Sequence, residues 1–244
     1  MSLPLSPTDR TTVRRGHARA ADDREVLHAL LDDALVAHLG VVVGGDQDGD
    51  GDQGGDGDGA PYPVVLPVAF AVDLAGPDDG GTLYVHGSVA ARWLGRSGGA
   101  TVCVTLTELD GLVAARSAFH HSMNYRSAVV IGAARVVVDA GEKQHALDLT
   151  VDHMVPGRAA TLRPSTRKEL AATAVLAVPL AEASVKVRAE GPVDDAEDVA
   201  AGTWGGVVPL RRVAGAPEHG ADSHDRVPED VRRRAVALGA PADH

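Results

Sequence analysis

The sequence predicts an α+β fold that is mainly β and built from antiparallel strands. Apolar and polar residues alternate in several short runs, and short turns rich in Gly, Pro and Asp separate these runs. Helical patterns flank the strands and do not alternate with them, as they would in a parallel, doubly wound sheet. We therefore expect neighbouring strands to pair as hairpins.

The composition limits the classes of function. Hydrophobic residues make up 44% of the 244 residues but aromatic residues only 3%, so the core should consist mainly of Val, Ala and Leu. The formal net charge of −11 argues against a general affinity for nucleic acid or anionic membranes. The single cysteine, Cys103, excludes an intrachain disulfide and a multi-cysteine zinc site. Without a signal-peptide pattern or a transmembrane-length apolar run, the chain is expected to be soluble and cytoplasmic.

The first half of the chain predicts one helix and most of the sheet. Asp22 or Asp23 can cap a helix through Leu35, and Leu27, Leu30 and Leu31 lie on one apolar stripe. Residues 44–59 form a Gly/Asp tract that should be a disordered loop, although Asp46, Asp48, Asp50 and Gly51 match the first half of a calcium-binding loop. Strands are expected at residues 38–43, 62–72, 82–86, 100–109, 112–119 and 126–138, with a short helix at 88–94 and a turn at Asp110 and Gly111.

The second half predicts two capped helices and two late strands. Asp139 with Glu142, and Thr166 with Glu169, have the spacing of a capping box. Strands are expected at residues 175–179 and 184–188. We interpret residues 1–20 as a flexible arm, 21–212 as one domain, and 213–244 as a flexible tail because that segment is polar and rich in Pro and Gly.

Residues 84–95 (YVHGSVAARWLG) form the first candidate site. The predicted strand ends at His86, Gly87 allows a tight turn, Ser88 can cap the next helix, and Arg92 follows one turn later. Free N–H groups, a hydroxyl and a guanidinium suit an anion such as a phosphate, although an ordinary helix cap with a solvated arginine explains the same residues.

Residues 115–127 (ARSAFHHSMNYRS) form the second candidate site, because they are polar without the residues typical of a turn. His120 and His121 are adjacent and would point to opposite faces of a strand, so we predict no metal site here. A third candidate is the strand with Lys186 and Arg188, which share a face and can hold an anion or form a charged outer edge. Trp204 can cover an aromatic ring or fill the core.

Taken together, several segments resemble the flavin-nucleotide-binding branch of the pyridoxamine 5′-phosphate oxidase-like superfamily, near the nitroimidazole-resistance reductases. The resemblance covers roughly residues 14–212 and rests on LYVHGSVAARWL, DGLVAARSAFHHSMNYRSAVV, DHMVPGRAATLRPSTRKEL, SVKVR and WGGVVPL. It implies a six-stranded antiparallel split β-barrel with peripheral helices, a homodimer, and FMN bound in the groove between subunits.

The resemblance also implies which residues contact the cofactor. The strand Val65, Leu66, Pro67 and Val68 would lie along the flavin ring, while His86, Gly87, Ser88 and Arg92 would hold its ribityl and phosphate oxygens. Arg126 and Ser127 match an Arg-Gln pair of the oxidases, with Ser in place of Gln. Lys186 and Arg188, from the third candidate strand, are the remaining candidate cofactor-binding residues.

The expected activity is that of an FMN-dependent oxidoreductase acting on a small molecule by hydride transfer at the flavin, with His86 or His120 as proton donor and NAD(P)H as a candidate electron donor. The C-terminal vitamin-binding pair of the oxidases has no equivalent, so pyridoxamine 5′-phosphate oxidase activity itself is not predicted. The alternatives are a haem-binding or haem-handling protein on the same fold, a flavin carrier or sensor without turnover, and a deazaflavin in place of FMN.

Overall fold

The computed structural model describes residues 4–6, 8–44, 60–91, 94, 97–223 and 226–241. The predicted Gly/Asp loop and its half calcium pattern lie outside the described residues, except for Gly44. Arg92 also lies outside them, as does most of the second turn of the helix predicted at residues 88–94.

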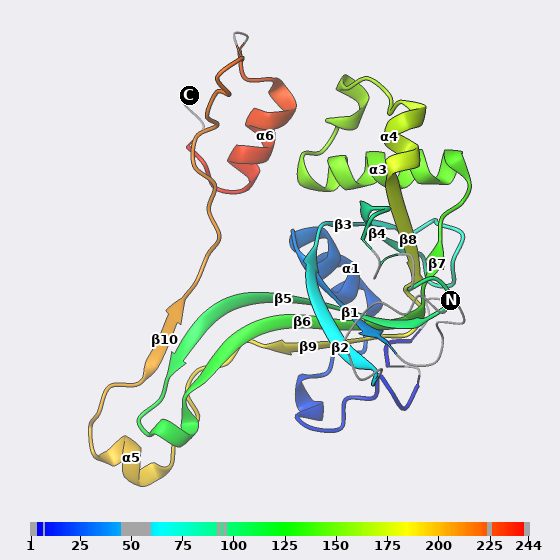
Figure 1. The fold of residues 1–244 in the computed structure, drawn as a ribbon. Coiled ribbons are helices and arrows are strands. Elements are labelled where there is room, and N and C mark those ends of the chain that lie inside the picture. The colour runs from blue at the N-terminus through cyan, green and yellow to red at the C-terminus, as the bar shows by residue number, and fades with distance from the viewer. Residues whose placement is uncertain are drawn as a thin grey trace.

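Two antiparallel sheets form the body of the molecule (Figure 1). The six-stranded sheet has the order β2 (Tyr62–Val68), β1 (Ala37–Val43), β5 (Thr101–Ala114), β6 (Ser122–Ala133), β9 (Ala183–Arg188), with β10 (Gly206–Pro209) also paired to β5. The four-stranded sheet has the order β3 (Phe70–Asp73), β4 (Thr82–Ser88), β8 (Thr173–Pro179), β7 (Arg135–Val136). The mainly β, antiparallel class is confirmed, but the strands form two sheets that do not close into one six-stranded barrel.

Two chain segments pass from one sheet to the other with a single residue between strands. Ala69 separates β2 from β3, and Ala134 separates β6 from β7. The strand predicted at residues 62–72 is therefore two strands, because each half pairs with a different sheet. These two corners hold the sheets face to face around the core.

Aliphatic side chains fill the space between the sheets, as the composition predicts. The helix α1 (Arg24–Asp33) adds Leu27, Leu30 and Leu31 to this core, and the Asp23 carboxylate caps it by accepting a hydrogen bond from the Glu25 N–H at 2.9 Å. The fully buried residues from the strands include Leu39, Leu83, Val85, Val104, Leu106, Val130, Leu176 and Val178.

The helices α3 (Ala140–Met154) and α4 (Arg167–Ala172) cover the four-stranded sheet on the side away from the core. Tyr84, Val175 and Ala146 belong to a second apolar cluster between α3 and this sheet. The capping box of Thr166 and Glu169 is confirmed. Asp139 also caps α3, but the Glu142 side chain contacts Arg135 instead of completing the box.

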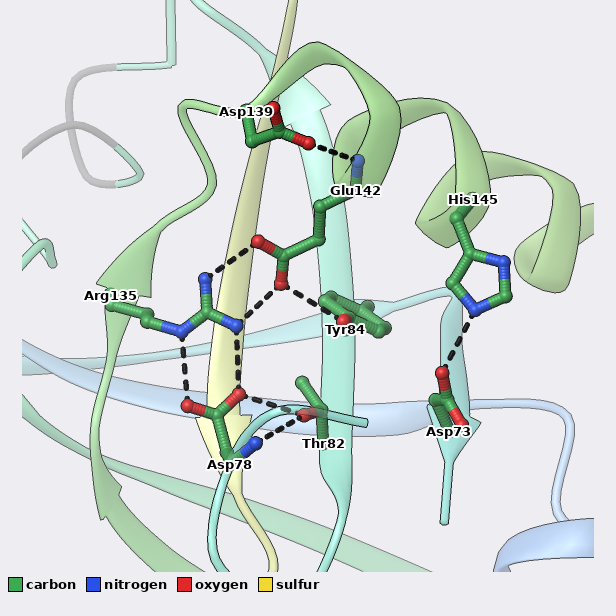
Figure 2. A network of polar contacts seen from close by, with 8 residues as sticks. All are labelled: Asp73, Asp78, Thr82, Tyr84, Arg135, Asp139, Glu142 and His145. Atoms are coloured by element: carbon green, nitrogen blue, oxygen red, sulfur yellow. Dashed lines mark hydrogen bonds and ion pairs between the residues drawn. The ribbon is translucent and has the colours of Figure 1, made fainter. Parts of the chain in front are cut away.

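Arg135 is the centre of a polar network that joins α3 to the four-stranded sheet (Figure 2). Its guanidinium donates two hydrogen bonds to Asp78 at 3.0 and 2.9 Å and contacts both carboxylate oxygens of Glu142. Tyr84 donates to Glu142 at 3.0 Å, and Thr82 donates to Asp78 at 2.7 Å. The pKa values of Asp78 and Glu142 are lowered, chiefly by their hydrogen bonds from Arg135.

The turn predicted at Asp110 and Gly111 is wrong. Strand β5 continues through both residues with a bulge between Leu109 and Gly111, and the reversal occurs instead at the short 3₁₀ helix η2 (Ala118–His120). Tertiary contacts explain the difference: Arg126 binds the Asp110 carboxylate, and β10 lies so close to Gly111 that a Cβ there would be 3.0 Å from Val207 Cγ1. The long β5–β6 hairpin projects from the body (Figure 1).

Described residues near both ends of the chain contact the body, where the sequence analysis expected a flexible arm and a flexible tail. Near the N-terminus, Leu5 is buried, the Arg10 guanidinium binds the Glu182 carboxylate, and η1 (His17–Arg19) precedes a bridge between Ala20 and Lys186. The helix α5 (Ala196–Ala200) and β10 lie within the predicted domain, and α6 (Glu229–Ala237) lies in the predicted tail.

Helix α6 lies against the end of α3. The buried Asp230 carboxylate is 3.4 Å from the Arg158 guanidinium, and Arg234 donates a hydrogen bond to the Met154 carbonyl at 2.8 Å. These contacts are polar and far apart in sequence, which explains why no local apolar pattern predicted them. None of the helices in the described part of the chain is long and apolar enough to cross a membrane.

Candidate functional site: the outer face of the six-stranded sheet

The six-stranded sheet has an outer face, made by the side chains that point away from the core. Strand pairing aligns one row of these residues across five strands: Pro67, His38, Thr105, Val129 and Ser184. Because neighbouring strands are about 4.8 Å apart, the row spans about 19 Å. It carries small, apolar and hydroxyl side chains apart from His38.

The predicted flavin strand contributes two of its four residues to this face. Val65 and Pro67 point outward, and the Val65 side chain is 65% exposed. Leu66 and Val68 point inward and pack against the core. This alternation follows from the two-residue period of a strand, so only Val65 and Pro67 offer side chains to a ligand on the outer face.

Ser127 and Lys186 face each other across β6 and β9 on the same outer face. Together with Val129, Ser184 and residues 10–14, they line a pocket of about 230 Å³. The Lys186 ammonium donates to the Arg15 carbonyl at 2.9 Å, which holds the N-terminal segment over the sheet. We call this the arm pocket, after the N-terminal arm whose residues 10–14 line it.

The arm pocket is cationic. Its lining contains Arg10, Arg14 and Lys186, hydroxyls from Thr11, Thr12, Ser127 and Ser184, and no carboxylate. Arg10 is paired with Glu182 outside the lining, while Arg14 is largely exposed and 3.7 Å from Asp9. Cationic and hydroxyl donors without a competing carboxylate suit a phosphate oxygen. The sequence indicated Ser127 and Lys186, but the contribution of residues 10–14 was missed because the arm was expected to be flexible.

Arg126 does not reach the arm pocket, because it points to the opposite side of the sheet. Its guanidinium donates to Asp110 at 3.1 and 3.0 Å and to Asp33 at 2.5 Å. These hydrogen bonds, chiefly the one that Arg126 donates to Asp110, raise the pKa of the Arg126 guanidinium. Within this chain Arg126 therefore ties the end of α1 to the β5–β6 hairpin.

Arg188 shares the face of Lys186 but is only 3% exposed. Its guanidinium donates to Asn124 Oδ1 at 2.5 Å and to the carbonyls of Glu190 and Gly191, both at 3.1 Å. Asn124, which the sequence analysis gave no separate role, is the side chain that fixes this arginine. These hydrogen bonds use both terminal guanidinium nitrogens, so Arg188 stabilises the β5–β6 hairpin in this conformation.

His86, Gly87 and Ser88 lie on the four-stranded sheet, away from the arm pocket. His86 pairs with Val175 and therefore shares the face of Tyr84, which packs against α3. Its Nδ1 atom is buried without a hydrogen-bond partner, and burial lowers the pKa of the imidazole. The Ser88 hydroxyl accepts a hydrogen bond from the Ala90 N–H at 3.2 Å, which is the type of contact expected from a cap.

His120 lies at the tip of the β5–β6 hairpin, where its Nε2 is 3.4 Å from the Asp195 carboxylate. The Trp204 side chain is 67% exposed and does not fill the core. Cys103 is half-buried on the outer face, and burial raises the pKa of its thiol. The described residues contain no group of three or more His, Cys, Asp or Glu side chains that could hold a metal ion.

The comparisons with known proteins agree with the fold. Residues 23–187 match the family described as pyridoxamine 5′-phosphate oxidase. The chain is similar to the flavocytochrome Anf3 from Azotobacter vinelandii, with 35% identity over 98% of this chain and 100% of the other, and a TM-score of 0.79.

A second solved structure, the FAD and haem binding protein from Mycobacterium smegmatis, is 38% identical over 88% of this chain and 97% of the other, with a TM-score of 0.76. No curated protein sequence matches the chain. The family match extends over more than half of the sequence and agrees with the mainly β, two-sheet fold. This chain belongs to the pyridoxamine 5′-phosphate oxidase family.

Proposed function

We propose that the chain is a flavin-binding redox protein that holds the flavin phosphate in the arm pocket and the flavin ring against the outer face of the six-stranded sheet. The observation that carries the proposal is the arm pocket itself: Lys186, Arg14 and four hydroxyls line it and no carboxylate does. Charge-assisted hydrogen bonds of this kind contribute about 1.5–3 kcal/mol each.

The rest of the outer face fits the remainder of a flavin. Val65, Pro67 and Val129 supply an apolar surface for a planar ring, and Thr105 lies between them with a hydroxyl. When bound, a flavin supplies hydride or electron transfer at its ring. The protein then orients the ring and excludes water from it.

Oxidoreductase activity is part of the proposal, with NAD(P)H as the candidate donor and a small molecule as the acceptor. Turnover of NAD(P)H with a dye acceptor separates a reductase from a carrier without turnover. His86 and His120 remain the predicted proton donors. His120 lies in η2 at the tip of the β5–β6 hairpin, whereas His86 lies on the α3 side of the other sheet with its Nδ1 buried.

We propose that a second copy of the chain covers the β5–β6 hairpin and the adjacent β10 segment. The exposed apolar residues of this region include Leu109, Leu112, Phe119, Met123, Trp204 and Val208. An apolar surface of this kind marks an interface. We propose that the protein is a homodimer and that it is located in the cytoplasm. Multi-angle light scattering tests the oligomeric state. A monomer at micromolar concentration would contradict this part of the proposal.

Haem is the second candidate cofactor, and the observation that favours it is His86. Burial lowers the pKa of this imidazole and so favours the neutral form that an iron ligand requires, and its Nδ1 has no hydrogen-bond partner among the described residues. The names of both similar proteins also refer to haem or a cytochrome. A strong Soret band in the purified protein that disappears in His86→Ala would establish haem binding.

The flavin proposal is tested by titrating the apoprotein with FMN, FAD or a deazaflavin and following the fluorescence. FMN is the expectation from the sequence, and chromatography of the flavin released from purified protein identifies the species. Lys186→Ala should weaken flavin binding by about 10- to 100-fold, the equivalent of one charge-assisted hydrogen bond.

Lys168→Ala, which removes a lysine from α4 on the other sheet, is the matched control and should leave the affinity unchanged. Equal flavin affinity in wild type and Lys186→Ala would remove the arm pocket from the proposal.

A further inference from the structure

A separate cleft lies between α1, β3 and α3, away from the outer face of the six-stranded sheet. Its volume is about 250 Å³, somewhat below the range of about 300–1,000 Å³ typical of sites for drug-sized ligands. The cleft is lined by His28, Leu31 and Asp32 from α1, Val72 from β3, Leu74 just after it, and Leu149, Asp152 and His153 from α3. Its size suits a small molecule.

Apolar side chains form the walls of this cleft. Leu31 belongs to the main core, Val72 packs against that core, and Leu149 packs against the cluster beneath α3. Leu74, at the rim, is 53% exposed. A ligand that enters the cleft therefore removes hydrocarbon surface from water, which is favourable by about 25 cal/mol per Å².

Two carboxylates give the cleft its charge. Asp152 accepts a hydrogen bond from the Ala159 N–H at 2.8 Å through Oδ1, which leaves Oδ2 for a ligand. Asp32 is exposed near the end of α1 and accepts no hydrogen bond from the described residues. No lysine or arginine lines the cleft.

Two histidines also line the cleft, and each is constrained by its surroundings. Burial, followed by the charge of Arg24, lowers the pKa of His28 and favours its neutral form. His153 donates from Nε2 to the Ala34 carbonyl at 2.7 Å, and its ring packs against Phe70 with 4.7 Å between ring centroids.

Arg24, whose charge acts on His28, donates to the carbonyls of Leu180 and Ala181, both at 2.8 Å. Three other arginines contact residues that flank the lining. Arg126 binds the Asp33 carboxylate, Arg212 donates to the Asp33 carbonyl at 2.6 Å, and Arg234 donates to the Met154 carbonyl at 2.8 Å. The described residues also provide no group of three or more metal-ligating side chains. An organic cation therefore fits this cleft better than a metal ion or an anion.

We propose that the cleft between α1, β3 and α3 binds a small organic ammonium ion with a short apolar body. The ammonium group lies between Asp152 and Asp32, and the apolar body contacts Leu31, Val72 and Leu149. This site is separate from the proposed flavin site, and the proposal does not depend on flavin binding.

Benzylamine is the test ligand, titrated into the full-length protein at neutral pH and followed by methyl NMR and calorimetry. Benzyl alcohol tests the charge, benzoate tests its sign, and methylammonium tests the need for an apolar body. We expect benzylamine to bind at least about tenfold more tightly than any of the three, since one charge-assisted hydrogen bond is worth at least a factor of ten. The methyl resonances of Leu31 and Leu149 should shift.

Asp152→Asn keeps an acceptor for the Ala159 N–H but removes the charge, so the variant should fold and lose at least about tenfold in benzylamine affinity. Asp148→Asn is the matched control, because Asp148 lies on the same helix but lines a different groove and accepts a hydrogen bond from Gln144. It should bind benzylamine as the wild type does.

The proposal is overturned if wild-type protein does not bind benzylamine at millimolar concentration, if benzyl alcohol binds as tightly, or if Asp152→Asn binds unchanged. If Asp152→Asn does not fold, the wild-type NMR data decide. Shifts at Leu147 or Leu162 without shifts at Leu31 and Leu149 would place the ligand in the other groove and overturn the proposal.

Discussion

Replacing Arg135 by alanine should destabilise the fold by breaking the network between α3 and the four-stranded sheet (Figure 2). The side chains of Asp78 and Glu142 are 13% and 21% exposed, and that of Arg135 is 37% exposed. Removing one partner of a fully buried ion pair costs about 3–5 kcal/mol, whereas an exposed pair contributes about 0–1 kcal/mol. With a partly screened arginine and two mostly buried carboxylates, we expect a loss of about 2–3 kcal/mol.

The measurement is the free energy of unfolding in urea at neutral pH. Arg163→Ala is the control, because Arg163 also makes a two-pronged pair with a carboxylate, that of Glu169, but both side chains are exposed. This control should change the urea midpoint little. Equal effects of the two substitutions would show that burial of the network does not determine its contribution, and would refute the reasoning.

The same network predicts the sign of a pH dependence. Arg135 lowers the folded-state pKa values of Asp78 and Glu142 below their ordinary values of about 4. Their contribution to stability is therefore present above that pH and is lost as the pH falls through the lowered values. The difference in stability between wild type and Arg135→Ala should shrink as the pH is lowered from 5 toward 2, and a constant difference would contradict this assignment.

Three further predictions concern other parts of the molecule. Tyr84→Phe should lower the free energy of unfolding by about 1 kcal/mol, because it removes the hydrogen bond to Glu142. Since the pKa of Tyr84 is raised to about 12, this difference, measured by urea unfolding, should diminish as the pH rises above 10. Deleting residues 45–59 should leave the melting temperature and flavin content unchanged, since Val43 already pairs with Tyr62 at the base of that loop; a large drop would reveal a structural role. Arg92→Ala should weaken flavin binding by about 1.5–3 kcal/mol if it contacts the phosphate as the sequence predicts, and unchanged affinity in a titration would leave the phosphate to the arm pocket.

Local signals predicted the helices and strands that depend on them. The Asp23 cap and the leucine stripe of α1, the Thr166–Glu169 capping box and the alternation along β5 are all contained within a few residues. These patterns predict an element wherever the local preference and the tertiary fold agree. They also predicted the antiparallel class, because successive strands are joined by short turns.

Features that depend on distant residues were not predicted. An Asp-Gly pair normally favours a turn, but Arg126 and β10 hold Asp110 and Gly111 in an extended, bulged strand. The strand at residues 62–72 divides because its two halves pair with different sheets. The terminal segments are held by contacts such as Arg158 with Asp230, which are 72 residues apart.

The candidate site shows the same division. Alternation along β9 correctly predicted that Lys186 and Arg188 share a face, and strand pairing brings Ser127 opposite Lys186. Sequence spacing did not reveal that Asp33, 93 residues away, binds Arg126, or that Asn124 binds the buried Arg188. Which cationic side chain remains available for a ligand depends on partners that only the tertiary structure brings together.

A crystal structure of the flavin-loaded protein tests the central claim most directly. Electron density for the flavin phosphate beside Lys186 and Ser127, with the ring over the face that carries Val65 and Pro67, is the predicted result. A flavin bound instead against the four-stranded sheet, with the arm pocket filled only by water, would contradict the proposed site.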